Sequence, residues 1–151
     1  MAVVDLKLPH HQYQIHIQPG LLVQLGALTM AVAKHERGTI IADESVQSLH
    51  LPTAMKSMEQ AGYQQVLTCT MNAGEHNKNL TTMQKLYDDL LNARMERKSP
   101  IVALGGGVIG DTVGFVAASY LRGVPFIQCP TTLLSMVDAS VGIKVAINYH
   151  R

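Results

Sequence analysis

Short apolar runs alternate along the chain with segments in which apolar residues recur every three or four positions. Runs of four or five apolar or alternating residues predict strands, because successive side chains of a strand point to opposite faces. The predicted strands are 13–17, 39–42, 65–69, 101–104 and 126–129. Apolar residues at helical spacing, broken by glycine and proline, predict helices between these strands. The predicted helices are 21–34, one within 46–62, 80–95 and 111–122.

Strands that alternate with helices and read as continuous apolar runs are typical of a parallel sheet buried on both faces. We therefore predict an α/β fold with a mainly parallel sheet covered by helices on both faces. Residues 1–10 are expected to be a lead-in or an edge strand, and residues 145–151 have the pattern of a further strand. The chain has the length of one domain, 1–151, without an internal repeat or a low-complexity linker.

Local signals mark the ends of two of the helices. Pro52-Thr53 is expected to open the second helix, since proline suits the first helical position, and Gly62 is expected to close it. Asn79 is the predicted N-cap of the third helix, because its side chain can accept a hydrogen bond from a free backbone N–H group.

Composition and charge exclude several classes of function. The chain has 47% hydrophobic residues and a formal net charge of +1, so we expect no broad basic face for nucleic acid. No apolar run approaches the length of a membrane span and the first residues lack the pattern of a signal peptide, so a cytoplasmic protein is expected. Cys69 and Cys129 lie in apolar runs without metal-ligand spacing and are predicted to be buried, reduced thiols.

The histidines do not form a metal-binding pattern. None of them is paired at the spacing that places two ligands on one helix face. We therefore predict no metal ligands in this chain and interpret most of its histidines as surface residues: His10, His11, His16, His35, His50, His76 and His150.

A glycine-rich turn follows the fourth predicted strand. Gly105, Gly106 and Gly107 come directly after 101–104 and lead into the next helix. Glycine lets the backbone approach a ligand closely and the free N–H groups of a first helical turn favour an anion, so this junction is predicted to hold a phosphate. Gly105, Gly107 and Gly110 also have the G-x-G-x-x-G spacing of dinucleotide-binding turns. A tight turn without any ligand remains the alternative.

Two features of the neighbouring sequence refine this prediction. In the common dinucleotide-binding fold an acidic residue ends the next strand and holds the ribose, whereas here the strand leads into Pro130-Thr131-Thr132. The ribose therefore needs another partner. No Gly-Lys-Ser/Thr follows the glycines, so a nucleotide triphosphatase loop is not supported.

Four motifs together resemble the signature of 3-dehydroquinate synthases. They are Gly-Gly-Gly-Val-Ile-Gly-Asp at 105–111, Ala-Ser-Tyr-Leu-Arg-Gly at 118–123, Pro-Thr-Thr-Leu-Leu-Ser at 130–135 and Val-Asp-Ala-Ser-Val-Gly-Ile-Lys at 137–144. The resemblance spans most of the chain but only the first, NAD-binding domain of that family. It implies a Rossmann-like sheet, and it implies that the all-helical, metal-binding second domain of the family is absent from this chain.

The resemblance also implies which residues contact NAD. Gly74 to Lys78 match a Gly-Glu-x-x-Lys motif in which Glu75 supplies a carboxylate for the ribose, with a solvated charge pair as the alternative. Asp43 matches a strand-end aspartate, but Ser45 stands where the family has asparagine, and a helix-capping role is the alternative. The implied NAD contacts are Asp43, Gly74, Glu75, Lys78, Gly105, Gly106, Gly107, Val108, Ile109, Gly110, Asp111, Thr131, Thr132, Leu134, Ser135 and Lys144.

Asp111, Thr131 and Thr132 each allow two interpretations. Asp111 in the first helical turn suits the helix dipole, yet beside a diphosphate it would be repelled unless it faces the ribose or a bridging water. The resemblance places it at the nicotinamide side of the site. Thr131 and Thr132 can cap the following helix or donate their hydroxyls to phosphate or ribose.

Three residues are implied contacts of a sugar phosphate substrate. In the family the arginine that matches Arg122 reaches the substrate phosphate of a partner subunit, which implies a homodimer; a cation that suits the end of its helix is the alternative. Lys144 would hold substrate oxygens and Asp138 a ring hydroxyl, and they converge only if the chain turns at Gly142. Ile143 replaces a family glycine, which displaces Lys144 if that position needs a positive φ.

The resemblance implies a reaction for the complete enzyme. It converts 3-deoxy-arabino-heptulosonate 7-phosphate to 3-dehydroquinate and phosphate in the shikimate pathway, with catalytic NAD and with zinc or cobalt held by the second domain. The chain alone is expected to be inactive and to bind NAD weakly. The alternatives are another sugar-phosphate cyclase, a domain like that of NAD-dependent glycerol or alcohol dehydrogenases, and a non-catalytic nucleotide-binding or dimerisation module.

Overall fold

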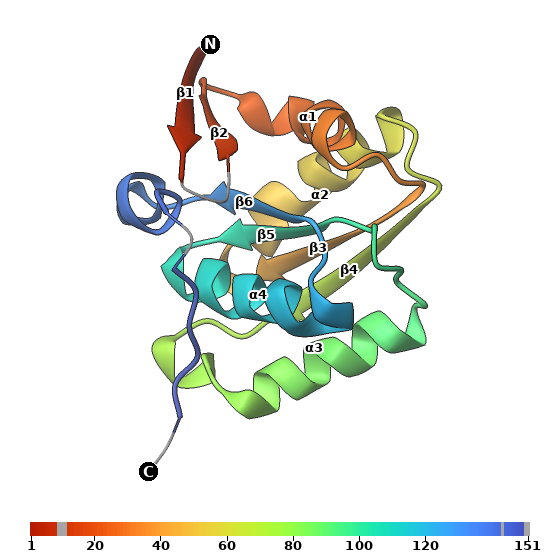
Figure 1. The fold of residues 1–151 in the computed structure, drawn as a ribbon, viewed down its shortest axis with the longest axis vertical. Coiled ribbons are helices and arrows are strands. Elements are labelled where there is room, and N and C mark those ends of the chain that lie inside the picture. Colours follow the sequence, from red (N-terminus) through yellow and green to blue (C-terminus); the bar gives the residue numbers. More distant parts are fainter. Residues whose placement is uncertain (9–11, 143, 150–151) are drawn as a thin grey trace.

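The computed structural model describes residues 1–8, 12–142 and 144–149 (Figure 1). Its strands are β1 (Ala2–Lys7), β2 (Gln12–Ile17), β3 (Arg37–Asp43), β4 (Gln65–Met71), β5 (Ile101–Gly105) and β6 (Phe126–Pro130). Its α-helices are α1 (Leu25–Val32), α2 (Glu44–Gln60), α3 (Leu80–Asn92) and α4 (Gly107–Ser119). Shorter helical segments are η1 (Leu21–Gln24), η2 (Glu75–Asn77), η3 (Tyr120–Arg122) and η4 (Ser135–Ala139). The predictions for His10, His11, Ile143 and His150 fall outside the described residues.

The centre of the fold is a four-stranded parallel sheet in the order β4-β3-β5-β6. Helices α3 and α4 cover one face of the sheet, and α1 and α2 cover the other (Figure 1). The central strands are apolar throughout because alternate side chains enter the two cores: Ile41 lies in the core with Leu86 of α3, and Ile40 lies in the core with Met58 of α2. The predicted α/β fold, with a parallel sheet covered on both faces, is confirmed.

The strand order reverses between β3 and β5. From β3 the chain runs outward to β4, and it then returns to the other side of β3 as β5. The loops after β3 and β5 therefore leave the sheet toward opposite sides, and open α/β sheets bind ligands outside the carboxyl ends of such strands. Asp43 ends β3 and Gly105 ends β5, so these two residues flank the expected ligand position.

Strands β1 and β2 form a separate antiparallel hairpin, in which Ala2 lies opposite Ile17 and Lys7 opposite Gln12. The predicted strand over 13–17 is thus confirmed. The first residues also form a strand, but it pairs with β2 and does not lie at the edge of the main sheet. Strand β1 is largely exposed, whereas exposed and half-buried residues mix along β2. Figure 1 shows the hairpin beside β6 and beside the segment that follows β6.

Helix α2 begins at Glu44, well before the predicted opening at Pro52. Asp43 is its N-cap, and Pro52 lies inside the helix. Proline removes the N–H group that would bond the carbonyl of Ser48, but Pro52 lies on the exposed side of the helix, where water can solvate that carbonyl. The predicted opening at proline is therefore wrong, whereas Gly62 does follow the end of the helix, with a φ of 98°.

The helix expected over 21–34 is present over 21–32 as η1 followed directly by α1, and β3 begins at Arg37, before the predicted strand, because Arg37 pairs with Gln65 of β4. The further strand expected over 145–151 is wrong for the residues that the structure describes there. Residues 144–149 form no strand and make one isolated parallel bridge, between Asn148 and Asn79. An apolar pattern makes a strand only where a sheet edge is available for pairing.

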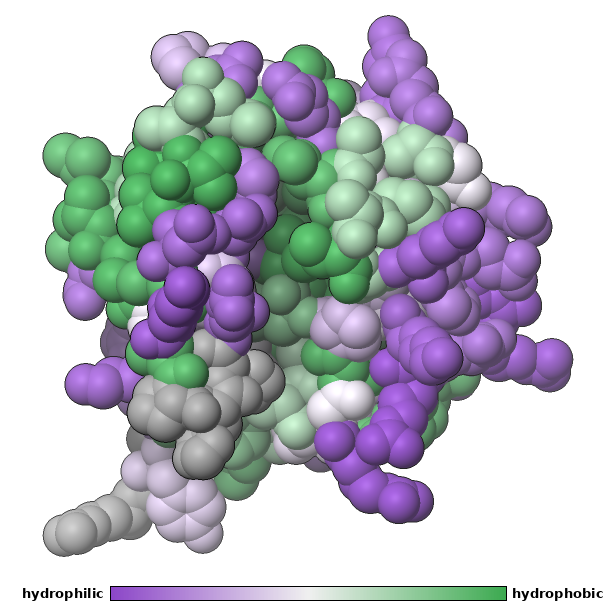
Figure 2. All heavy atoms as spheres, turned by 45° about the horizontal axis from the view of Figure 1, so that its top comes forward, coloured by the Kyte–Doolittle hydropathy of each residue, from purple (hydrophilic) through white to green (hydrophobic). Residues whose placement is uncertain are grey.

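Apolar side chains after β6 are exposed. The large apolar side chains exposed there include Leu133, Leu134, Met136, Val137, Val141 and Tyr149. Apolar side chains gather on the left of Figure 2, the side on which Figure 1 shows the hairpin and η4. Contiguous apolar surface of this kind is typical of a contact with further protein. Within the described ranges, no helix combines the length and apolar character that a membrane span requires.

Candidate functional site

The start of α4 presents free backbone amides to an open surface. Gly106 is the N-cap and offers no side-chain cap, and the first amide bonded back to it is that of Gly110, whose N–H donates to the Gly106 carbonyl at 3.1 Å. The earlier amides of a helix have no partner within the helix. A Cβ atom built on Gly107 would meet no atom within 4 Å. The positive end of the helix dipole therefore faces space that an anion can occupy.

Close packing requires glycine at position 105, at the switch point of the sheet, which is the place between β3 and β5 where the strand order reverses. A Cβ atom on Gly105 would lie 2.5 Å from Cγ2 of Ile109 and 2.9 Å from Cβ of Asp43. The absence of a side chain thus brings the ends of β3 and β5 together. Asp43 Oδ1 accepts hydrogen bonds from Ser45 N–H at 2.9 Å and from Ser45 Oγ at 2.6 Å, so the capping role foreseen for Asp43 is observed.

The segment after β6 closes over the glycine turn. Thr131 N–H donates to the Gly105 carbonyl at 2.9 Å. Thr132 and Ser135 cap each other, since Ser135 N–H donates to Thr132 Oγ1 at 3.2 Å and Thr132 N–H donates to Ser135 Oγ at 3.3 Å. Thr131 Oγ1 is buried and has no hydrogen-bond partner in the described part of the chain. Buried hydroxyls are normally bonded, so this atom suits a ligand oxygen.

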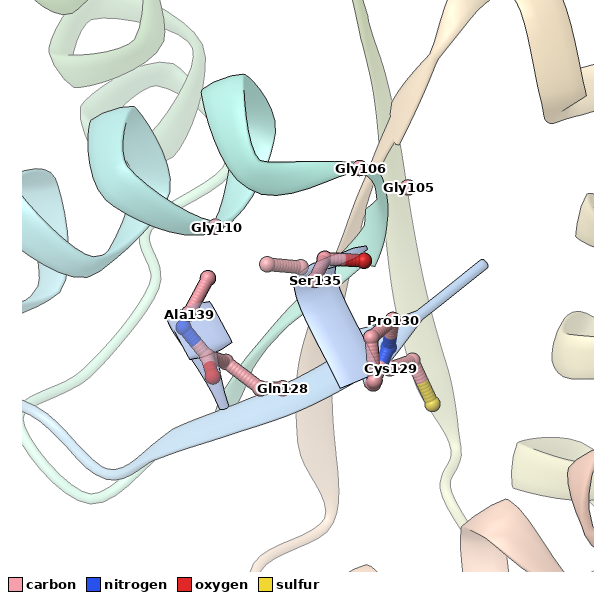
Figure 3. A pocket seen from close by; sticks show the side chains of 9 residues that line it. Gly105, Gly106, Gly110, Gln128, Cys129, Pro130, Ser135 and Ala139 are labelled. Carbon is pink, nitrogen blue, oxygen red and sulfur yellow. The ribbon is translucent and has the colours of Figure 1, made fainter. Parts of the chain in front are cut away.

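A small pocket lies behind the turn, bounded by Gly105, Gly106, Gly110, Ser135 and Ala139 among others (Figure 3). Its volume is about 10 Å³, which is about what one water molecule needs. Figure 3 shows the turn at the start of α4 facing Ser135 and Ala139 of η4. A nucleotide would therefore lie over the turn, outside this pocket.

Lys78 connects the loop after β4 to helix α4. Its Nζ donates to Asp111 Oδ2 at 2.6 Å and lies 3.7 Å from Glu75 Oε1. The Lys78 side chain is only 12% exposed. The pair of Glu75 and Lys78 is therefore not the freely solvated charge pair that was the alternative interpretation of this motif. Asp111 lies beyond the first turn of α4, which begins at Gly107, and the prediction that placed Asp111 in that turn is wrong. The ammonium group offsets the charge that would repel a diphosphate from Asp111.

The chain passes this loop again near its end. Asn148 N–H donates to the Lys78 carbonyl at 2.7 Å, and Asn148 Nδ2 donates to Glu75 Oε1 at 2.9 Å. Asn148 belongs to none of the four sequence motifs. No local signal identifies it, because the contact joins residues 73 positions apart.

The residues implied for the substrate are exposed. Asp138 is on η4, Lys144 follows the turn at Gly142, and that glycine has the φ of 120° that such a turn requires. Arg122 lies beyond the far end of α4, which at 13 residues is about 20 Å long. The structure therefore does not bring Arg122 to the glycine turn of its own chain. Leu134 is 72% exposed, also away from the pocket.

Tyr13 of the hairpin holds the turn that precedes Lys144. Its hydroxyl accepts a hydrogen bond from Gly142 N–H at 2.6 Å and lies 3.2 Å from the carbonyl oxygens of Ser140 and Gly142. In the sequence, Tyr13 is recognisable only as a residue of the alternating strand pattern over 13–17. The hairpin thus supports the candidate substrate segment as well as its own pairing.

Replacing Tyr13 by phenylalanine is expected to loosen this turn without unfolding the domain. A hydrogen bond contributes about 1 kcal/mol, and water can reach the exposed groups that lose their partner. Hydrogen exchange measured by NMR should show the Gly142 amide exchanging several-fold faster. Tyr149→Phe is the control, because Tyr149 is 80% exposed and the same hydroxyl is removed. Equal exchange of Gly142 in both variants would contradict the prediction.

Both cysteines are free thiols, as predicted. Burial raises the pKa of Cys129 to about 12, and burial together with the nearby Asp89 carboxylate raises the pKa of Cys69 to about 12. Both thiols therefore stay protonated and weakly nucleophilic near neutral pH. Within the ranges that the structure describes, no group of three histidine, cysteine or acidic side chains is arranged to hold a metal ion.

Comparisons with known proteins agree with the motif analysis. The family model described as 3-dehydroquinate synthase N-terminal matches residues 68–151. The curated 3-dehydroquinate synthase of Citrifermentans bemidjiense is 45% identical over 148 residues, which are 98% of this chain and 41% of that protein. The chain thus spans about two fifths of the length of the curated relatives that it matches.

Solved structures share the fold. A crystal structure of 2-deoxy-scyllo-inosose synthase complexed with carbaglucose-6-phosphate, NAD+ and Co2+ has a TM-score of 0.88 at 23% identity, covering 98% of this chain and 40% of that one. ValA, the 2-epi-5-epi-valiolone synthase of Streptomyces hygroscopicus, with NAD+ and Zn2+ bound, has a TM-score of 0.79 at 32% identity, covering 95% of this chain and 39% of that one. With its motifs, its fold and the family match in agreement, the chain belongs to the family of the N-terminal domain of 3-dehydroquinate synthases.

Proposed function

We propose that this chain is the NAD-binding part of a 3-dehydroquinate synthase, which converts 3-deoxy-arabino-heptulosonate 7-phosphate to 3-dehydroquinate and phosphate. The observation that carries the proposal is the open start of α4 at the switch point of the sheet, where nothing lies within 4 Å of a Cβ atom on Gly107. The unpartnered hydroxyl of Thr131 borders the same turn. Both features suit the diphosphate of a dinucleotide.

The residues at this turn fit NAD by their chemistry. The amides of Gly106, Gly107 and Val108 would donate to the diphosphate, with the helix dipole favouring its charge. Thr131 Oγ would donate to a phosphate or ribose oxygen and so gain the partner that it lacks. When bound, NAD supplies reversible hydride acceptance from a substrate alcohol.

The charged residues of the loop after β4 would hold the ribose. Glu75 is 63% exposed, and a carboxylate accepts hydrogen bonds from a ribose diol. Lys78 would act mainly by holding Asp111, to which it is bonded at 2.6 Å. The start of α4 and the loop after β4 are thereby joined into one surface for the cofactor.

The position of Arg122 supports a homodimer. An arginine about 20 Å along α4 from the glycine turn cannot serve the site of its own chain, but its exposed guanidinium can bind a phosphate bidentately at the site of a second copy. Leu121 and Arg122 also have left-handed φ values of 48° and 68°, which are uncommon outside glycine and are concentrated at functional positions. Asp138 and Lys144 would bind substrate oxygens within the same chain.

The metal does not fit this part of the protein. The described residues offer no set of ligands for zinc or cobalt. We assign the ion to the part of the relatives that lies beyond the length spanned by this chain. The exposed apolar side chains after β6 are a suitable surface for that part to cover.

A synthase is favoured over another sugar-phosphate cyclase by the degree of similarity. The curated relatives named 3-dehydroquinate synthase are 42–46% identical to this chain, whereas the cyclases of known structure described above are 23–32% identical. The specificity of these enzymes for their sugar phosphates depends on substrate contacts, so a product assay decides between them.

The proposal is tested by titrating the purified chain with NAD and by assaying phosphate release from the heptulosonate phosphate. We expect saturable, weak NAD binding and no turnover, because the residues present bind the cofactor but hold no metal. Absence of NAD binding would refute the cofactor proposal, and turnover by this chain alone would refute its dependence on further protein. Net formation of NADH from glycerol or a simple alcohol would favour a dehydrogenase.

A further inference from the structure

Asn148 is bonded to the loop that would hold the NAD ribose. Its side-chain amide Nδ2 donates to Glu75 Oε1 at 2.9 Å and lies 3.3 Å from the Glu75 carbonyl. Its backbone N–H donates to the Lys78 carbonyl at 2.7 Å. Side chain and backbone thus contact both ends of the Glu75-to-Lys78 segment.

These bonds constrain the carboxylate of Glu75. Oε1 receives the Asn148 amide at 2.9 Å and lies 3.7 Å from the ammonium group of Lys78. A glutamate that is 63% exposed would otherwise sample several rotamers, and fixing them costs free energy when a ligand binds. With Oε1 engaged by Asn148 and Lys78, Oε2 is the carboxylate oxygen that can accept a hydrogen bond from a ligand.

We propose that Asn148 is a positioning residue that orients the Glu75 carboxylate for a ribose diol. The inference rests on the proposed NAD function and deepens it. Asn148 lies four residues after Lys144, the candidate substrate contact. The same bonds therefore tie the segment that would hold the substrate to the loop that would hold the cofactor.

The role of the Asn148 side chain can be tested separately, because the backbone hydrogen bond of Asn148 does not depend on that side chain. Asn148→Ala removes the amide that bonds Glu75 but keeps the N–H that bonds the Lys78 carbonyl. Asn148→Asp keeps the size of the side chain and places a second carboxylate against Glu75. Asn92→Ala is the matched control, because Asn92 is exposed at the end of α3, away from this loop.

NAD binding is measured by calorimetry for the chain, for the three variants, for Glu75→Ala and for the double variant Glu75→Ala/Asn148→Ala. We expect Asn148→Ala to weaken binding about five-fold, as the loss of one hydrogen bond predicts, and Asn148→Asp to weaken it further. In the Glu75→Ala background, Asn148→Ala should have no additional effect, because its action passes through that carboxylate. Asn92→Ala should bind as the unaltered chain does.

The outcomes separate this inference from the function on which it rests. If the chain binds NAD but Asn148→Ala binds it equally well, only the positioning role is overturned. The role is also overturned if Asn148→Ala weakens binding equally with and without Glu75, since Asn148 then acts only by holding the chain in place. If the unaltered chain does not bind NAD, both proposals fall.

Discussion

Replacing Gly107 by valine is expected to weaken NAD binding at least about tenfold, equivalent to about 1.4 kcal/mol, while the chain remains folded. The space beside Gly107 is empty, so the fold accommodates a side chain there. The same side chain would occupy the space proposed for the diphosphate and would keep it from the first amides of α4. Calorimetric titration with NAD and thermal unfolding followed by circular dichroism measure the two quantities.

Ala118→Val is the matched control for this variant. Ala118 is exposed on the last turns of the same helix, so a similar apolar addition is made far from the glycine turn. We expect unchanged NAD affinity for this control. Wild-type affinity in Gly107→Val would show that the nucleotide does not lie over the start of α4.

Replacing Gly105 by alanine is expected to destabilise the fold by about 2 kcal/mol, which is typical of overpacking in a core. The new methyl group would lie 2.5 Å from Cγ2 of Ile109 and 2.9 Å from Cβ of Asp43, so either helix α4 or the end of β3 has to shift. Urea unfolding followed by circular dichroism measures the loss as a lower midpoint with an unchanged slope.

Gly107→Ala provides the control for Gly105→Ala. It adds the same methyl group two positions along the chain, where no atom lies within 4 Å, and alanine favours a helix over glycine. We therefore expect an equal or higher midpoint for Gly107→Ala. Equal midpoints for both alanine variants would contradict the close packing of Gly105 against Asp43.

The sheet and the glycine turn could be predicted from the sequence because both depend on short-range patterns. Side chains on neighbouring positions of β5 enter opposite cores, so a buried parallel strand must be apolar throughout and reads as a continuous run. Three consecutive glycines, which end the strand and open the helix, allow the tight turn at this junction. Asp43, Gly105 and Thr131 stand at or directly after the ends of neighbouring parallel strands, and such strands end on the same side of the sheet, where the structure places these residues.

Predictions from local sequence were wrong where capping, burial or strand pairing elsewhere in the fold outweighed the local preference. Pro52 favours the start of a helix, but the cap at Asp43 and the burial of Met58 stabilise a helix that passes through it. The apolar pattern after Lys144 suggests a strand, but apart from the bridge at Asn148 the described residues there do not join a sheet.

The order of elements, the parallel sheet and the position of the glycine-rich turn follow from patterns within a few residues of one another, and these the sequence specifies directly. Which side chains become partners was decided by the tertiary structure. The bond from Lys78 to Asp111 joins residues 33 positions apart, and that from Gly142 to Tyr13 joins residues 129 apart. Such pairs form because folding brings segments that are distant in the sequence into contact, and the spacing of residues along the chain does not specify which distant segments will meet.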